Sequence, residues 1–404
     1  MADKVQESGL SKLKSFATKN SMTIALVVVF ALFCYLTGGR LLYAQNMSNL
    51  LLQNGYVLVL ACGMLLCILT GGNIDLSVGS VICLTGGMAA VMVNNLGWNS
   101  YITIIICLLV GLLVGIWQGY WIGYVRIPPF ITTLAGMFVF RGIGRLVLDS
   151  KTVPIKDKAF MNLFTSYINI PGLDVISTRA NPVENPHIWS PLVVGAIAVV
   201  LIFFMIARSR ANKAKNGYHQ NKAIVDYGRA LIVSALILWY CDKLSNYKGI
   251  SVMLVWVLAV CLIYYFITSK MAFGRYFYAV GGNEKATRLS GIDTNRVYFI
   301  AYANMGLLAG LCGLLCLARV GSVSGQTGTS FEMDAIASCF IGGASAYGGV
   351  GTVGGVVIGA LLLGVLNMGM SIIGITDSWQ YVVKGGVLLV AVIFDVVSSR
   401  KTAR

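Results

Sequence analysis

Long apolar runs separated by short polar stretches dominate the 404-residue chain. A membrane-spanning helix needs about 20 mostly apolar residues. We therefore expect spans at 22–37, 50–70, 78–94, 101–124, 130–148, 189–207, 230–241, 250–268, 297–318, 335–348, 352–373 and 379–397. The runs lack the period-two alternation of a membrane β-barrel. Because short or glycine-interrupted runs can be re-entrant, the pattern predicts an all-α polytopic membrane protein with about 10–12 transmembrane or re-entrant helices.

Composition points to the same class. Hydrophobic residues make up 57% of the chain and charged residues 11%, whereas soluble domains carry about 25% charged residues. These values exclude a soluble enzyme, a nucleic-acid-binding protein and a disordered chain. Almost all of the ten cysteines lie inside apolar runs. Cys312 and Cys316 are one helical turn apart, but no histidine or carboxylate accompanies them, so we predict no metal site.

The placement of charge predicts the orientation of the chain in the membrane. The formal net charge is +15, and the basic residues gather in short polar stretches, which is the positive-inside pattern. We expect a transmembrane domain over 22–397, with cytoplasmic segments at 1–21, 208–229, 269–296 and 398–404. The stretch 149–188 balances basic against acidic residues and is expected on the periplasmic side. The charge therefore indicates topology and predicts no nucleic-acid partner.

Regularly spaced glycines predict close helix packing. Small residues on one helix face let two backbones approach each other, and two series have such spacing: Gly111, Gly115, Gly119 and Gly123, then Gly359, Gly364 and Gly369. The stretches 111–142 and 359–386 also resemble each other weakly. Each predicts a glycine-spaced helix, a break, and a second helix that carries a basic residue. Repeats with broken helices are typical of transporters, and the substrate path lies near the breaks.

Two polar, glycine-rich stretches interrupt the apolar runs. The first, 69–80, places Asn73, Asp75 and Ser77 between two runs. Asp75 suits an N-cap of the 78–94 helix, and a role toward substrate is equally open. The second, 340–355, has seven glycines in sixteen positions. Irregular backbone at membrane depth is tolerated only inside protein or beside a wet cavity. The stretch is not followed by the lysine of a phosphate-binding loop, so no ATP hydrolysis by that route is predicted.

A third polar stretch, 271–296, is too polar to span and basic enough to be cytoplasmic. It predicts a short helix from Asn283 to Leu289, with Asn283 as its cap and Gly291 as its left-handed stop. A short, stiff helix on the cytoplasmic face favours a docking element over the alternative, a plain linker between spans.

Together with PPFITTLAGMFVFRG (128–142) and WQYVVKGGVLLVAVIFDV (379–396), these three stretches resemble the permease subunit of bacterial ABC importers for monosaccharides. This is the family of the ribose, xylose and multiple-sugar permeases. The resemblance covers residues from about 45 to 397 and is strongest to the multiple-monosaccharide branch, through LCILTGGNIDLSVGS and FGRYFYAVGGNEKATRLSGI.

The resemblance implies import of a xylose-, glucose-, galactose- or arabinose-type aldose by alternating access, in the bacterial cytoplasmic membrane with both termini cytoplasmic. It implies a homodimer, two ABC ATP-binding domains or a tandem ATPase, and a periplasmic or extracellular sugar-binding protein. The chain itself would be no enzyme and would hold no cofactor. The implied ATPase-coupling residues are Gly274, Arg275, Gly281, Gly282, Asn283, Lys285, Ala286, Leu289, Ser290 and Gly291. The general importer pattern of Glu-Ala-Ala followed by Gly is matched only at Ala286 and Gly291.

A neutral sugar needs a wet, hydrogen-bonding path through the bilayer, because unpaired hydroxyls cost several kcal/mol each in hydrocarbon. The candidate path residues are Asn73, Asp75, Trp117, Gln118, Phe130, Thr133, Phe138, Arg141, Gln326, Asn367, Trp379 and Gln380. Trp117 and Gln118, beside the glycine series, form the leading pair. The intramembrane cations Arg141, Arg145, Arg319 and Lys384 are either functional or neutralised by Asp334, Asp377 or Asp395.

Two other classes remain open at this point. An ion-coupled secondary sugar transporter would need an intramembrane carboxylate, for which Asp75 is the candidate. A membrane-embedded enzyme would need clustered histidines or carboxylates near one membrane face. The two histidines, His187 and His219, are expected on opposite sides, which disfavours an enzyme.

Overall fold

A computed structural model describes residues 21–175, 187–218 and 223–402. Most of the predicted cytoplasmic segment 1–21, His219 and the last two residues of the tail lie outside the described residues. The α-helices are α2 (Ser21–Leu36), α3 (Ala44–Leu69), α4 (Val78–Ala90), α5 (Ser100–Gly123), α6 (Pro129–Val147), α7 (Lys158–Thr165), α8 (Ser190–Lys215), α9 (Ala223–Ser245), α10 (Val252–Lys270), α11 (Ala272–Gly282), α12 (Glu284–Leu289), α13 (Thr294–Val320), α14 (Phe331–Ile341), α15 (Val353–Ile373) and α16 (Asp377–Thr402). A short 3-10 turn, η1 (Arg40–Leu42), precedes α3, and a π-turn, η2 (Val91–Asn95), extends α4. The predicted all-α class is confirmed.

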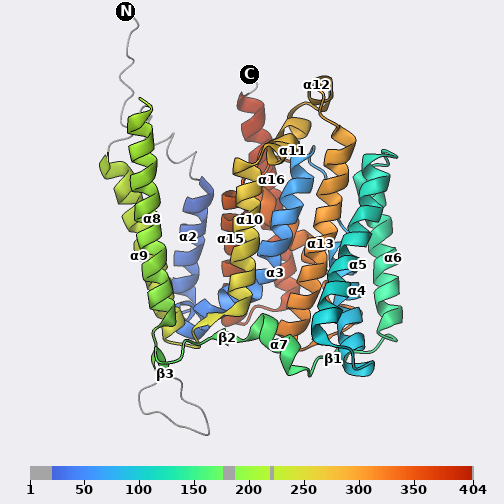
Figure 1. Ribbon diagram of the computed structural model, residues 1–404, viewed down its shortest axis with the longest axis horizontal. Coiled ribbons are helices and arrows are strands. Elements are labelled where there is room, and N and C mark those ends of the chain that lie inside the picture. The colour runs from blue at the N-terminus through green and yellow to red at the C-terminus, as the bar shows by residue number, and fades with distance from the viewer. Residues whose placement is uncertain (1–20, 176–186, 219–222, 403–404) are drawn as a thin grey trace, which may run out of the picture.

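Six two-residue strands form three small antiparallel pairs. The strands are β1 (Val153–Pro154), β2 (Tyr167–Ile168), β3 (Asp174–Val175), β4 (His187–Ile188), β5 (Ile250–Ser251) and β6 (Ser322–Val323). β1 pairs with β6, β2 with β5, and β3 with β4. With α7 they lie at one end of the helical bundle (Figure 1).

Nine helices among the described residues are long and apolar enough to cross a membrane. Three of the twelve expected spans are not among these nine: 22–37, which forms the 16-residue α2, 335–348, and 379–397, which lies within α16. Two expected spans differ most from the structure in length. The run 335–348 forms only α14, whose 11 residues reach about 16 Å at 1.5 Å per residue, too short for a hydrocarbon core of about 30 Å. The short run 230–241 is part of α9, which has 23 residues. The loop expected at 208–229 is therefore mostly helix, because α8 continues to Lys215 and α9 begins at Ala223.

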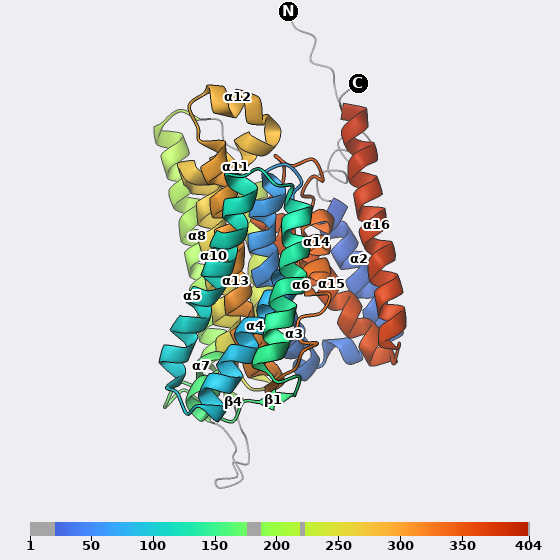
Figure 2. The same cartoon turned by 90° about the vertical axis from the view of Figure 1, so that its right-hand side faces the viewer.

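The helices stand side by side, with two distinct ends (Figures 1 and 2). α11, α12, the start of α2 and the end of α16 lie at one end, while α7 and the short strands lie at the other. The basic stretch 269–296 and the balanced stretch 149–175 are thus on opposite ends, as the charge pattern predicts. α3, α4 and α13 supply most of the buried core, whereas α8 and α9 stand at one edge with most of their side chains exposed.

The glycine series of α5 forms a groove that α13 fills, as the spacing predicts. A Cβ atom on Gly111 would lie 2.6 Å from the carbonyl oxygen of Gly306, and one on Gly119 would lie 2.6 Å from that of Phe299. Contacts this close exclude any side chain on α5 at these positions, so the two backbones pack directly. The second series contacts three different helices, since Gly359 meets α14, Gly364 meets α3 and Gly369 meets α2.

Candidate functional site

The three glycine-rich stretches of the sequence meet at one place in the fold. A Cβ atom on Gly281, near the end of α11, would lie 1.9 Å from the carbonyl oxygen of Leu69 and 2.4 Å from the amide nitrogen of Gly349. Leu69 ends α3, and its carbonyl accepts a hydrogen bond from the amide of Gly349 at 3.0 Å. The polar 271–296 stretch therefore packs its backbone against both helix breaks.

Further close contacts join the two breaks to each other. A Cβ atom on Gly72 would lie 1.9 Å from the carbonyl oxygen of Ala346, and one on Gly348 would lie 2.5 Å from Gly71. The Tyr278 hydroxyl of α11 donates to the carbonyl of Gly351 at 2.9 Å. We call this arrangement of residues 69–72, 278–282 and 346–351 the glycine junction. The parts of the junction therefore touch through main-chain atoms, which leave little room between α11 and both breaks.

The short helix predicted at 283–289 is present as α12. The Asn283 side chain accepts a hydrogen bond from the amide of Ala286 at 2.9 Å, and Gly291 has a φ of +84°, so both predicted end signals are confirmed. The Thr287 hydroxyl donates to the carbonyl of Ala279 at 2.8 Å, which fixes α12 against α11. Leu289, at the tip, is 90% exposed. The capped helix therefore holds a large apolar side chain in solvent at its tip.

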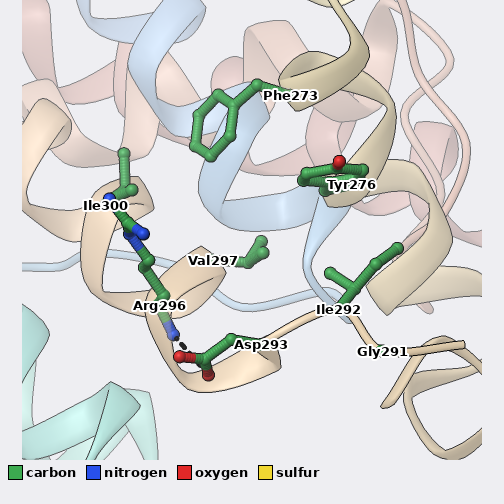
Figure 3. A pocket seen from close by; sticks show the side chains of 8 residues that line it. All are labelled: Phe273, Tyr276, Gly291, Ile292, Asp293, Arg296, Val297 and Ile300. Atoms are coloured by element: carbon green, nitrogen blue, oxygen red, sulfur yellow. Dashed lines mark hydrogen bonds between the residues drawn. The ribbon is translucent and has the colours of Figure 1, made fainter. Parts of the chain in front are cut away.

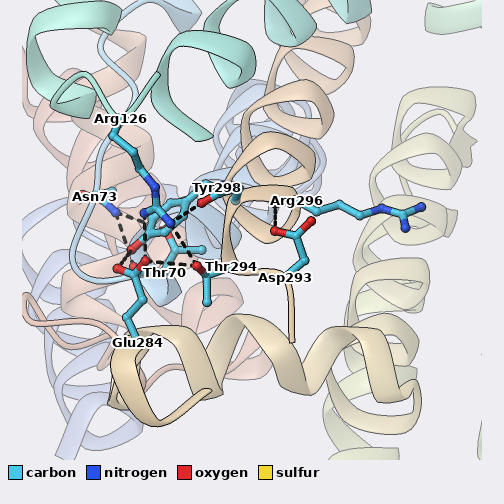
Figure 4. Close-up of polar contacts among 9 residues, drawn as sticks. Thr70, Asn73, Arg126, Glu284, Asp293, Thr294, Arg296 and Tyr298 are labelled. Carbon is cyan, nitrogen blue, oxygen red and sulfur yellow. Dashed lines mark hydrogen bonds and ion pairs between the residues drawn. The ribbon is translucent and has the colours of Figure 1, made fainter. Parts of the chain in front are cut away.

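An ion pair attaches α12 to the loop between α5 and α6 (Figure 4). Arg126 Nη1 lies 2.8 Å from Glu284 Oε1, and Arg126 Nη2 donates to the Thr294 hydroxyl at 2.9 Å. Glu284 also accepts hydrogen bonds from the Tyr298 hydroxyl at 3.0 Å and the Thr294 hydroxyl at 3.1 Å. We call Arg126, Glu284, Thr294 and Tyr298 the Arg126 latch.

The latch keeps Glu284 ionised. Partial burial raises the pKa of this carboxyl, but the hydrogen bond from Tyr298, the charge and hydrogen bond of Arg126 and the hydrogen bond from Thr294 outweigh burial, and the pKa is lowered overall. A carboxyl with a lowered pKa in the folded state stabilises that state above its ordinary pKa, and loses this contribution as pH falls through the lowered value. Glu284 is therefore ionised at neutral pH, and its contribution to stability is lost only as pH falls through the lowered pKa.

A cavity of about 540 Å³ lies beside the latch, between α11 and α13 (Figure 3). Its lining residues are Phe273, Tyr276, Gly291, Ile292, Asp293, Arg296, Val297 and Ile300. Asp293 caps α13 by accepting the amide of Arg296 at 3.2 Å. The cavity offers two aromatic rings from α11 and a cation from α13 next to the exposed tip of α12.

We expect Arg126→Gln to loosen α12 without unfolding the protein. Both partners of the ion pair are about one-third exposed, so the change should cost about 1 kcal/mol, which corresponds to roughly five-fold faster local opening. Hydrogen exchange of the amides in 284–291 measures this. Lys270→Gln removes the same charge from the end of α10 and is the matched control. Equal protection of 284–291 in both variants would contradict a fastening role for Arg126.

Two of the candidate path residues are brought together in the core. The Ser77 hydroxyl donates to Asp75 Oδ1 at 2.7 Å, and Gln118 Nε2 donates to the Ser77 hydroxyl at 2.6 Å. All three side chains are buried. Asn73 lies on the same loop and donates to the Thr70 hydroxyl at 3.2 Å. The chain of hydrogen bonds ties the first helix break to α5.

One sequence-based expectation about this region needs correction. Asp75 does not cap α4 directly, because Asp75 Oδ1 accepts the amide of Ser77, the residue before the helix. The role of Trp117 and Gln118 toward substrate stays a prediction, and their side chains face different surroundings. Gln118 is 1% exposed, whereas Trp117 is 43% exposed and packs edge-on against Phe140. Successive residues on a helix point about 100° apart, so neighbours in sequence face different surroundings.

The remaining path candidates are scattered over the bundle. Phe130 and Phe138 on α6 and Trp379 on α16 are exposed. Thr133 is buried but donates to the carbonyl of Pro129 in its own helix, and Gln380 donates to the carbonyl of Ile375. Gln326 is exposed in the segment before α14, and the Asn367 Oδ1 atom is buried without a hydrogen-bond partner among the described residues. Within one chain these side chains form no single site.

The intramembrane cations have identifiable partners. Lys384 Nζ lies 3.1 Å from Asp334 Oδ1, so Asp334 is the neutralising residue among those considered. Arg141 donates to the carbonyl of Thr327 at 2.5 Å, and Arg319 to that of Gln53 at 3.4 Å. The Asp395 side chain lies outside the described residues.

The sequence pattern does not predict the Arg126 latch. Glu284 is an acid in a basic stretch, which is a signal for a local ion pair, but Arg126 is far away in the chain and nothing in the pattern connects the two. Arg126 has a φ of +65°, an uncommon value for a residue with a side chain. Such strain is visible only in the structure.

The fold and the site define a class of protein: a multi-pass helical membrane transport subunit, with buried helix breaks joined to a stiff helix at one end. Residues 46–392 match the family described as branched-chain amino acid transport system / permease component, and the chain belongs to this family. The expected permease class is confirmed.

Named relatives cover nearly the whole chain. It is 36% identical over 395 residues to the xylose transport system permease protein of Escherichia coli K12, which covers 98% of this chain and 96% of that protein. It is 36% identical over 381 residues to the xylose permease protein of Haemophilus influenzae, with coverages of 94% and 96%. The ribose import permease protein of E. coli K12 is 30% identical over 385 residues, with 95% of each chain covered. No solved structure matches the chain.

Proposed function

We propose that this protein is the permease subunit of an ATP-driven importer that carries a monosaccharide across the cytoplasmic membrane. The relatives are named for xylose and ribose, which favours a sugar substrate. The relatives are components of transport systems, and nothing in them favours the ion-coupled alternative. Which monosaccharide is carried, and the closeness to the multiple-monosaccharide branch, stay predictions from the sequence.

The single observation that carries the mechanism is the main-chain contact of Gly281 with Leu69 and Gly349. ATP binding on a separate subunit would displace α11 and α12, and the glycine junction would transmit this movement to the two helix breaks. Access to the path would then alternate between the two membrane faces. The chain performs no covalent chemistry in this scheme.

The proposed assembly is a homodimer with two ATP-binding domains, or a tandem ATPase, and a sugar-binding protein on the opposite face. The end that carries α11, α12, the start of α2 and the end of α16 would be cytoplasmic, since the basic stretches gather there. The exposed aromatic side chains of Phe130 and Phe138 on α6 and of Trp379 on α16 would face the path between the two copies. Each could stack on a sugar ring.

Leu289→Asp should separate the permease from its ATPase. A charge at this 90% exposed apolar tip would be desolvated without a partner on docking, and truncation of an anchoring residue at an interface costs 2 kcal/mol or more. We expect ATP hydrolysis that copurifies with the tagged chain from native membranes to fall at least about ten-fold. Leu96→Asp, at an exposed leucine on the opposite end, is the matched control.

The orientation is tested on the same residue. A membrane-impermeant thiol reagent should label Leu289→Cys in inside-out vesicles and not in intact cells, with the wild-type chain as background. Labelling in intact cells, or unchanged ATP hydrolysis with Leu289→Asp, would refute the coupling role of α12.

A further inference from the structure

The paired helices α8 and α9 carry a basic hollow that contains none of the candidate path residues and lies outside the glycine junction. The hollow has a volume of about 360 Å³ and lies between the facing ends of the two helices. Its lining residues are Ile202, Ile206, Ser209, Arg210, Lys213, Asp226, Arg229, Ala230 and Val233. A second hollow, of about 510 Å³, adjoins it on the other side of Ser209 and Lys213, and includes Arg208.

The charge of the hollows is positive and only partly neutralised. Arg210 forms an ion pair with Asp226 and lies over the ring of Tyr227. Arg208, Lys213 and Arg229 form no ion pair within the described part of the chain. Four cations against one carboxylate leave an excess charge of +3 that favours an anionic ligand.

The depth of the hollows matches the level of phospholipid headgroups. The apolar part of α8 runs from Ser190 to Ala207, which is about 27 Å at 1.5 Å per residue. This length nearly equals the hydrocarbon core of a bilayer, about 30 Å. Arg208 and the cations that follow it therefore begin where the hydrocarbon ends.

On its membrane side, the first hollow continues into an apolar surface that suits acyl chains. Ile202, Ile206 and Val233 line the first hollow on its membrane side. Beyond them, exposed apolar side chains cover the outer faces of α8 and α9, among them Phe204, Met205, Leu231, Ile232 and Leu236. A free anion would use only the cations, whereas a lipid would use both surfaces. Basic pockets between membrane helices recognise anionic headgroups in this way.

We propose that the α8–α9 hollow binds an anionic phospholipid, with its phosphate held by Lys213 and Arg229 and its acyl chains against Ile206 and Val233. The lipid would fill the gap between two helices that have few other contacts with the bundle. This site is independent of the transported substrate.

The test compares two double variants of the full chain in nanodiscs. Binding of phosphatidylglycerol over phosphatidylcholine is measured by native mass spectrometry. Lys213→Gln/Arg229→Gln should weaken phosphatidylglycerol binding about 25-fold, since each cation near an anionic headgroup contributes about five-fold. Lys156→Gln/Lys158→Gln makes the same charge change beside α7 at the opposite end and should leave binding unchanged. If the double variant does not fold, the single Lys213→Gln variant should give about a five-fold loss.

Three outcomes would overturn the proposal. Equal losses in the two double variants would show a general charge effect without a site. Competition by inorganic phosphate or glycerophosphoglycerol at concentrations that match the lipid would identify a free anion as the ligand. Unchanged binding in Lys213→Gln/Arg229→Gln would place the lipid elsewhere.

Discussion

Gly281→Ala is expected to abolish transport, whereas Gly228→Ala, on α9, should leave it nearly unchanged. A Cβ atom at position 281 would lie 1.9 Å from the carbonyl oxygen of Leu69, and no atom lies within 4 Å of a Cβ at position 228. The clashing atoms belong to main chain on two other segments, so they can move only if α11 leaves the glycine junction. Overpacking of this kind costs 1–3 kcal/mol or more, while alanine at a compatible helical glycine is mildly stabilising.

Sugar uptake into cells that express the transport system measures the effect. The amount of each variant in the membrane and its elution as a single species in detergent show that the chain is inserted and folded. We expect at least about ten-fold lower uptake for Gly281→Ala, in line with the loss of 1.4 kcal/mol or more of junction packing. Equal uptake by the two alanine variants would show that contact between α11 and the helix breaks is not needed for coupling.

The sequence predicts features that depend on neighbours along the chain. Asn283 and Gly291 are separated by one short helix, and capping is a local hydrogen-bond requirement, so both ends of α12 follow from residue type. The α5 series from Gly111 to Gly123 repeats once per turn, and such a stripe predicts a packed backbone without identifying α13 as the partner.

Hydropathy misjudged two helix lengths for a physical reason. The run 335–348 is apolar throughout, but Gly343 has a φ of +85° and the helix has already ended at Ile341. A hydropathy average does not respond to backbone conformation. In α9 the opposite occurs, because charged residues at the ends, such as Asp226, shorten the apolar run, although Asp226 pairs with Arg210 and stays helical.

The sequence pattern also does not predict that the three glycine-rich stretches meet in the fold. Each stretch is irregular by composition, and composition does not say that Gly72 touches Ala346 or that Gly281 touches Gly349. The same holds for Arg126 and Glu284, which come from different loops. Pairing across the fold depends on how the helices pack, and packing is decided by contacts that no single segment contains.

Asp334→Asn is expected to destabilise the bundle, and a second change, Lys384→Met, should restore much of the loss. Asp334 on α14 is 8% exposed and accepts hydrogen bonds from Lys384 on α16 at 3.1 Å and from the Tyr56 hydroxyl on α3 at 2.9 Å. It therefore joins three helices through one carboxylate. Loss of this charge leaves the Lys384 ammonium, 22% exposed, without its counter-ion, at a cost of about 3 kcal/mol.

The double variant distinguishes the interaction between Asp334 and Lys384 from the effect of removing a polar group at either position. A neutral methionine in place of the lysine removes the uncompensated charge, which is the costly consequence of breaking a buried ion pair. Thermal unfolding in detergent, read for the wild type, both single variants and the double variant, gives the coupling free energy of the cycle. If the two single losses add in the double variant, Lys384 and Asp334 do not stabilise each other, and α16 must be held to α14 by its apolar contacts alone.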